Sequence, residues 1–230
     1  MSLVPFPSMH SLRWIPLFTL PLASCVFVVG DSDWYDRHSV RGSGRRVEED
    51  RQVPDFHAID LETCADVKVT VGEANSVHLS GDDNVLPMVK TRVDNGVLSI
   101  DLPGSYSYRC NLEVVIGTPS LDRFTIEGSG DVDIQGLAAD EVKLAIEGSG
   151  TIHARGTAES LIGSIEGSGT LGLSDLDAKS AELSIEGSGS MEVRVAKLLR
   201  YSIDGSGDIE YSGNPELGGD IDGSGSVEKR

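Results

Sequence analysis

The chain has 230 residues, of which 37 are acidic and 19 are basic, giving a formal net charge of −18. This balance argues against binding to nucleic acid and against adsorption to anionic lipid, because both need a basic face. The length allows one or two domains, and a regular repeat in the C-terminal half favours one elongated domain.

Residues 1–24 have the features of an export signal. Arg13 precedes an apolar run over residues 14–22 that is too short to span a bilayer. The following Leu-Ala-Ser-Cys, which ends at Cys25, resembles the lipobox of bacterial lipoproteins, where the peptide is cleaved before the cysteine and lipid is attached to its thiol. The resemblance implies that a lipid on Cys25 anchors an exported protein in the cell envelope. Val26 resembles signals that direct lipoproteins to the outer membrane. The alternative is an ordinary secretory signal that is cleaved nearby.

Residues 25–53 are expected to form a flexible tether. They are polar and contain glycine and mixed charge, as in residues 41–46. They show no apolar period that could bury one face, so nothing in the pattern predicts packing.

Residues 54–120 are expected to form irregular first coils of a solenoid. Apolar and polar residues alternate over 67–72 and again over 97–102, which indicates strands with one buried face. Asp94-Asn95-Gly96 predicts a turn just before the second of these strands. Terminal units of solenoids are commonly atypical because they shield the end of the stack.

Two cysteines remain once Cys25 is assigned to lipid, and an even number in an exported protein favours a disulfide. A bond between Cys64 and Cys110 would join two early coils. Its closed loop would be worth about 3–4 kcal/mol in the chain-entropy estimate. The alternative is a plain buried thiol at Cys110, which shares the inward parity of Leu112 and Val114.

A five-residue phrase, Ile-Glu/Asp-Gly-Ser-Gly, is repeated six times within residues 121–230. Its copies begin at residues 126, 146, 165, 185, 203 and 221. A near-constant period of this size is the signature of a solenoid, in which each coil rests on its neighbours. Strands with period-two alternation flank the phrase, and its glycines supply the corner between them. The pattern predicts an all-β, parallel β-helix with coils of 18–20 residues, about nine of them over residues 54–230.

The chain also resembles a known family. Residues 55–102 are similar to the opening of the auto-transporter adhesin domain called head GIN, and phrases such as Gly128-Ser129-Gly130-Asp131-Val132 look like its repeating signature. The resemblance covers roughly residues 54–230. It implies a right-handed, single-stranded parallel β-helix in a bacterial envelope protein, often a lipoprotein, and it brings no catalytic residues. One departure from the family pattern is the acidic residue before every Gly-Ser-Gly.

That acidic position is the feature of the repeats most able to bind something. Neighbouring coils lie about 4.8 Å apart, and two unit charges at that distance repel by about 0.9 kcal/mol in water. The carboxylates therefore either fan into solvent or share cations, for which calcium is the natural candidate because it takes carboxylate and backbone oxygens. The chain lacks the Gly-Gly-x-Gly-x-Asp turns of known calcium-binding solenoids, so a solvated acidic edge is the alternative. The acidic column consists of Glu127, Glu147, Glu166, Glu186, Asp204 and Asp222.

The serines of the phrase form a second column, which we interpret as structural because stacked hydroxyls can hydrogen-bond along the axis. A nucleophilic role would need a nearby base, and the only histidine in the regular repeats is His153. His57 and His78 are expected to be surface residues rather than metal ligands, so no cofactor is predicted. The serine column consists of Ser129, Ser149, Ser168, Ser188, Ser206 and Ser224.

These features predict a non-catalytic cell-envelope lipoprotein that serves as a β-helical surface interaction or adhesion module with an unidentified ligand. The first alternative is a periplasmic structural or stress-related lipoprotein without an adhesive role. The second is a carbohydrate-active β-helix enzyme, which is disfavoured because the basic residues of the repeats are scattered. Residues 227–230 follow closely after the last corner, so either a charged cap or end-to-end self-association is expected there.

Overall fold

The computed structural model describes residues 39–103, 105–106 and 111–230, and these residues are all β apart from one short 3-10 helix, η1 (Leu86–Met88). The strands are β1 (Ser39–Val40), β2 (Arg46–Arg51), β3 (Ala58–Glu62), β4 (Asp66–Val71), β5 (Ser76–Asp82), β6 (Lys90–Asp94), β7 (Val97–Asp101), β8 (Ser105–Tyr106), β9 (Glu113–Thr118), β10 (Arg123–Gly128), β11 (Asp131–Gly148), β12 (Thr151–Gly167), β13 (Thr170–Gly187), β14 (Ser190–Gly205), β15 (Asp208–Ser212), β16 (Glu216–Gly223) and β17 (Ser226–Lys229). Among these residues there is no helix long and apolar enough to cross a membrane.

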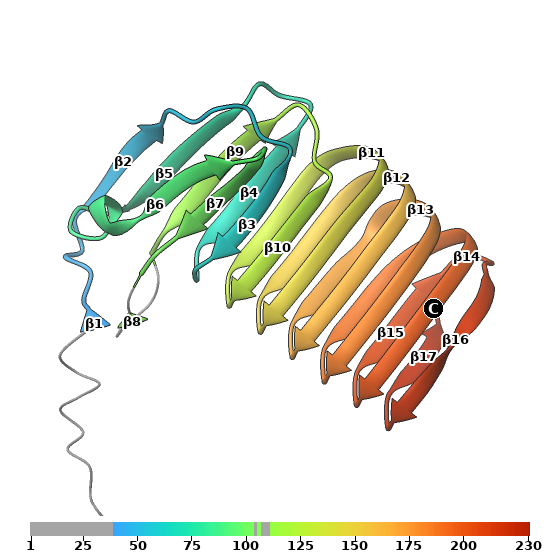
Figure 1. Ribbon diagram of the computed structural model, residues 1–230. Coiled ribbons are helices and arrows are strands. Elements are labelled where there is room, and N and C mark those ends of the chain that lie inside the picture. Colours follow the sequence, from blue (N-terminus) through green and yellow to red (C-terminus); the bar gives the residue numbers. More distant parts are fainter. Residues whose placement is uncertain (1–38, 104, 107–110) are drawn as a thin grey trace, which may run out of the picture.

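From β10 onward the chain winds as a parallel solenoid (Figure 1). Each of β11 to β14 makes most of one coil, and a Gly-Ser-Gly corner leads into the next. We call the column of strands before the corners the front face; it runs from β7 through β3, β10 and residues 141–148 of β11 to β16. The back face follows the corners and runs from β9 through β4 and residues 131–135 to β17. This architecture confirms the predicted fold class.

The repeated phrase is required by the corner that it forms. In the first five copies its isoleucine is buried, and it pairs with the isoleucine of the next coil, as Ile165 does with Ile185. Its first glycine has a positive φ of +125° at Gly167 and +124° at Gly187, a backbone conformation that other residues resist. A Cβ on Gly187 would lie 2.4 Å from the carbonyl oxygen of Gly167. The corners therefore stack too closely for any side chain at this position.

Main-chain hydrogen bonds join each corner to the one before it. The amide of Ser188 donates to the carbonyl of Gly167 at 2.8 Å, and equivalent serine amides donate at 2.7–2.9 Å in the other corners from residue 149 to 224. Behind the corners, one apolar cluster runs through the whole stack, and Phe124 is its largest fully buried side chain. Columns of Ile, Val and Leu fill this narrow core, in agreement with the low aromatic content.

The N-terminal coils do not follow chain order. The strand order along the front face is β10, β3, β7 and β6, so the coil made by β3 and β4 lies between the regular stack and the later coil made by β7 and β9. Three antiparallel pairings close this end: β5 with β9, β2 with β5, and β6 with β7. The regular solenoid has about five turns, which the two irregular coils of β3–β4 and β7–β9 extend, and the rest of residues 54–120 forms the cap, so the expected nine coils are wrong.

The prediction that the flexible tether extends to residue 53 is also wrong. Residues 46–51 form β2, which pairs with β5 along its whole length. The loop before β2 is held to residues 82–84, since the amide of Gly44 donates to Asp82 at 3.0 Å. β2 is mostly exposed and held by its main chain, so it has no apolar period that sequence reasoning could detect. The signal, Cys25 and the first part of the expected tether lie outside the described residues.

Candidate functional site

The predicted acidic column is a ladder in the structure. Strand register pairs Glu127 with Glu147, Glu147 with Glu166 and so on through Asp204 to Asp222, one residue per coil on the front face. All six side chains are exposed. The sequence placed these carboxylates in one row correctly, because every copy has the same offset from its buried isoleucine.

The ladder continues beyond the repeats. Glu62 ends β3 one residue after Leu61, the register partner of Ile126, and Glu62 itself pairs with Asp101 at the end of β7. Eight carboxylates therefore follow one another from the cap to the last coil. Sequence reasoning missed the first two because their corners lack Gly-Ser-Gly and their coils are out of chain order. The detectable signal was an acidic residue directly after the last inward residue of each strand.

The electrostatic consequence is visible at Glu127. Burial raises the pKa of Glu127 above its ordinary value, and the neighbouring Glu62, Glu147 and Asp60 carboxylates raise it further. At the cap, Lys90 of β6 stands opposite Asp101 and ends the ladder with a positive charge. In the described part of the chain, no group of three His, Cys, Asp or Glu side chains could hold a metal ion. Calcium binding to the ladder stays a prediction.

The serine column lies at the corners beside the ladder, with all six side chains exposed. The amides of Ser149 and its equivalents bind the preceding corner, while no hydrogen bond joins one of the six hydroxyls to the next. The contribution of these serines to stacking thus comes from their backbone. Their hydroxyls add a polar strip to the edge of the front face.

The histidines lie apart from both columns. His57 Nδ1 is 3.0 Å from an Asp122 carboxylate oxygen, and both side chains are more than half exposed. His78 Nδ1 is 2.7 Å from Asp50 Oδ1. This hydrogen bond raises the pKa of His78, with smaller support from the charges of nearby carboxylates. Both side chains lie at the surface, each beside an aspartate.

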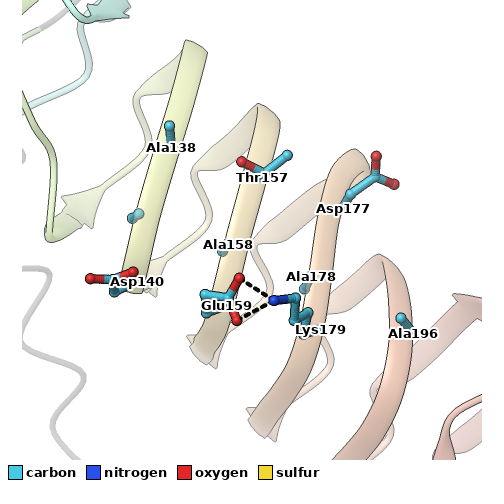
Figure 2. A pocket seen from close by; sticks show the side chains of 10 residues that line it. Ala138, Asp140, Thr157, Ala158, Glu159, Asp177, Ala178, Lys179 and Ala196 are labelled. Atoms are coloured by element: carbon cyan, nitrogen blue, oxygen red, sulfur yellow. Dashed lines mark hydrogen bonds and ion pairs between the residues drawn. The ribbon is translucent and has the colours of Figure 1, made fainter.

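A shallow groove crosses the third face, which lies between the back and front faces of each coil (Figure 2). It has a volume of about 590 Å³, and its floor is formed by Ala139, Ala158 and Ala178, which occupy one register position in successive coils. Along one side, Lys179 is paired with Glu159. Ala158 and Ala178 are themselves buried, and the accessible methyl groups of the groove are those of Ala138, Ala139 and Ala196. Exposed polar side chains, among them Asp140 and Asp177, line it as well, so the groove suits an extended chain with both apolar and polar groups. Sequence reasoning missed it, although alanine recurs there with the period of the coil.

Cys64 lies in the corner between β3 and β4 and is disulfide-bonded. The two other cysteines of the chain, Cys25 and Cys110, lie outside the described residues. The pairing of Cys64 with Cys110 therefore stays a prediction.

Comparison with known proteins agrees with this architecture. The family model described as "Putative auto-transporter adhesin, head GIN domain" matches residues 55–215. The chain belongs to this head GIN family. The description points to an adhesin-type protein of the surface or envelope, and the resemblance inferred from the sequence is confirmed. None of the curated proteins compared with the chain matches it.

Solved structures share the fold at low sequence identity. A protein from Bacteroides fragilis described as a putative adhesin superposes with a TM-score of 0.69 at 21% identity, over 84% of this chain and 100% of that chain. A protein from Parabacteroides distasonis described as a putative lipid binding protein superposes with a TM-score of 0.58 at 22% identity, over 84% of this chain and 99% of that chain. A protein from Parabacteroides merdae described as a putative adhesin superposes with a TM-score of 0.57 at 20% identity, over 84% of this chain and 99% of that chain. At these identities the comparison establishes the fold.

Proposed function

We propose that the protein is a non-catalytic, lipid-anchored envelope module that binds its partner through the front face of the solenoid. The observation that carries the proposal is the ladder of eight carboxylates in one register on an exposed, repetitive surface. Such a surface presents the same chemistry at every coil. It suits an extended or multivalent partner, because many weak contacts add along its length.

The adhesin description of the family supports this function. The repetition itself argues against catalysis. Acid–base catalysis by two carboxyl groups needs environments that push their pKa values apart. The raised pKa of Glu127 comes from burial and from other carboxylates alone, with no basic partner among its causes. Beyond Glu127, each carboxylate of the regular ladder has carboxylates as neighbours on both sides, so their surroundings are alike. A carbohydrate-active enzyme is therefore the weakest of the three candidates.

The lipid anchor is the second part of the proposal. The first described strand is β1, and residues 26–38 lie between it and Cys25 in the sequence. A fully extended chain spans at most about 3.6 Å per residue, which limits this link to roughly 45 Å. A lipid on Cys25 would thus hold the capped end of the solenoid close to the membrane.

Protease treatment of intact cells, beside the Cys25→Ala variant, tests the anchor and the orientation together. We expect the wild-type protein to be membrane-bound and cleaved on intact cells, and the variant to be released. Protection of the wild type until the outer membrane is opened would exclude adhesion and leave the periplasmic structural role. A variant that stays in the membrane fraction would contradict lipidation at Cys25.

The binding surface is tested by charge-neutral variants of equal size. One variant replaces three neighbouring ladder residues by glutamine, and its control replaces three glutamates elsewhere on the repeats. The ladder variant is Glu147→Gln, Glu166→Gln and Glu186→Gln, and the control is a row of three glutamates on the back face, Glu192→Gln, Glu210→Gln and Glu228→Gln. We expect adhesion of cells displaying the protein to fall for the ladder variant alone. Equal adhesion of both variants would locate the binding surface elsewhere, with the alanine groove as the next candidate.

A further inference from the structure

The last front-face strand, β16, has an open edge. It pairs with β14 on one side, and no strand among the described residues pairs with its other side. All eight of its residues are exposed. Leu217 and Ile221, which continue the inward columns of Leu199 and Ile203, are 44% and 41% exposed. An edge of this kind presents unpaired main-chain groups and apolar side chains, and so it is a template for another strand.

The cap has an open edge on the same face. β6 pairs only with β7 in the part of the chain that the structure describes. Lys90 and Arg92 point outward and are exposed, whereas Thr91 and Val93 are half-buried opposite the core residues of β7. The third outward residue of β6 is Asp94, which leaves this edge with a net positive charge, whereas the outward residues of β16 include Asp220 and Asp222. The two ends of the front face (Figure 1) thus carry opposite net charge.

The register shows how these edges fit. Inside the chain, β6 runs antiparallel to β7 and places Lys90 opposite Asp101 and Arg92 opposite Ser99. Asp222 is the ladder residue of β16, and Asp220 follows the column that contains Ser99.

We propose that β6 of a second copy pairs antiparallel with β16, so that copies of the chain associate head to tail. With the same register as β6 on β7, Lys90 of the second copy would stand opposite Asp222, and Arg92 opposite Asp220. Opposite charges at directly opposed positions of an antiparallel pair are favourable, and like charges are unfavourable. On the inward side, Thr91 would lie opposite Ile221 and Val93 opposite Gly219, so the contact would cover Ile221.

The charges favour this head-to-tail contact over a two-fold symmetric contact between the β16 strands of two copies. Pairing β16 with β16 of another copy would oppose the acidic side chains of both strands. Charged residues on an edge strand ordinarily block association, but here each basic residue of β6 has an acidic counterpart at the other end of the molecule. A head-to-tail contact is heterologous and does not close on itself, so it generates linear assemblies. This association needs neither the lipid anchor nor the adhesive ligand, and it stands independently of the proposed function.

Charge exchange at one opposed pair tests the proposal. Arg92 and Asp220 are both exposed, and neither has an ion-pair partner among the described residues, so replacing them leaves the fold intact. The full chain carrying Cys25→Ala is studied by sedimentation velocity over a range of concentrations at low salt. We expect association beyond dimers, weakened about three- to tenfold by Arg92→Glu or by Asp220→Lys, since each replaces an attractive pair by a repulsive one.

The combination of the two substitutions is the decisive variant. On one chain, Arg92→Glu with Asp220→Lys restores opposite charges at the contact, so we expect association to return toward the wild-type level. Far-UV circular dichroism of each variant checks that the solenoid is intact. A wild-type protein that stays monomeric at every concentration, one that stops at dimers, or a double variant no better than the single ones would overturn the head-to-tail contact.

Discussion

Replacement of the first glycine of a corner is expected to destabilise the solenoid more than any exposed substitution. At Gly187 two independent costs meet: φ is +124°, and an added Cβ would lie 2.4 Å from the carbonyl oxygen of Gly167. That oxygen cannot move away freely, because it accepts the amide of Ser188 at 2.8 Å. Gly187→Ala must therefore strain its own backbone and also push two coils apart.

The two costs can be separated with a second glycine. Gly72 has a φ of +98°, but nothing lies within 4 Å of the position of its Cβ. Gly72→Ala should cost only the conformational term, about 1–3 kcal/mol. Gly187→Ala adds an overpacking term of about 1–3 kcal/mol, so its total should be about 2–6 kcal/mol. Ser188→Ala, which alters an exposed hydroxyl in the same corner, should change stability by less than about 0.5 kcal/mol.

Urea unfolding of the purified protein, followed by circular dichroism, measures these differences as changes in midpoint at constant m. A lower m for Gly187→Ala would mean that the coils on the two sides of the altered corner no longer unfold together. The reasoning fails if Gly187→Ala costs no more than Gly72→Ala, because the contact between corners would then not be what requires glycine.

Three further predictions concern charge. Glu166→Gln should raise stability by at most about 2 kcal/mol at low salt, because it removes two like-charge contacts of about 0.9 kcal/mol each, and the gain should vanish near 1 M salt. The raised pKa of Glu127 gives stability that is present below the ordinary glutamate pKa and lost as pH rises through the raised value. Unfolding midpoints measured across the acidic pH range should therefore show that the stability of Glu127→Gln relative to the wild type increases as pH rises. For His78, an NMR titration should give a pKa above 6.5 in the wild type and a lower value in Asp50→Asn, since the hydrogen bond to Asp50 is the main cause of the shift. An unchanged His78 titration in the variant would contradict that cause.

The regular half of the fold was predictable because each coil repeats the same local requirement. The glycine corner and the buried isoleucine fix where each coil begins and ends, and the ladder follows from their constant offset. The unequal coil lengths are absorbed elsewhere. Register shifts fall between Ile134 and Leu137 of β11 and at the corresponding bends of β12 and β13, toward the third face. A period that varies between 18 and 20 residues is thus compatible with an unbroken front face.

The cap was not predictable by the same means. Period-two alternation identifies a strand and its buried side, but it is identical for parallel and antiparallel neighbours. Nothing in residues 58–62 indicates that the later strand β7 lies beside them. Sequence analysis also failed to predict β2, for a different reason. Its residues are charged, and its place depends on main-chain bonds to β5 and on contacts such as that of Arg46 with Glu113, 67 residues away.

The ladder and the corner together limit what kind of partner would fit the proposed binding surface on the front face. The carboxylates can stay in one row because each exposed like-charge pair costs little, about 0.9 kcal/mol in water at strand spacing. A shift in the register between coils would cost more, because it would break the hydrogen bonds between corners and expose the isoleucine column. The spacing of the carboxylates is therefore set by the backbone and cannot adapt to a ligand. A partner of the front face must bring positive charge at a matching repeat, and its binding must weaken steeply with salt. Binding in the alanine groove would cover the methyl groups of Ala138, Ala139 and Ala196 beside fewer carboxylates, and so would respond less to salt. Measuring adhesion against ionic strength consequently distinguishes the two surfaces before any ligand has been identified.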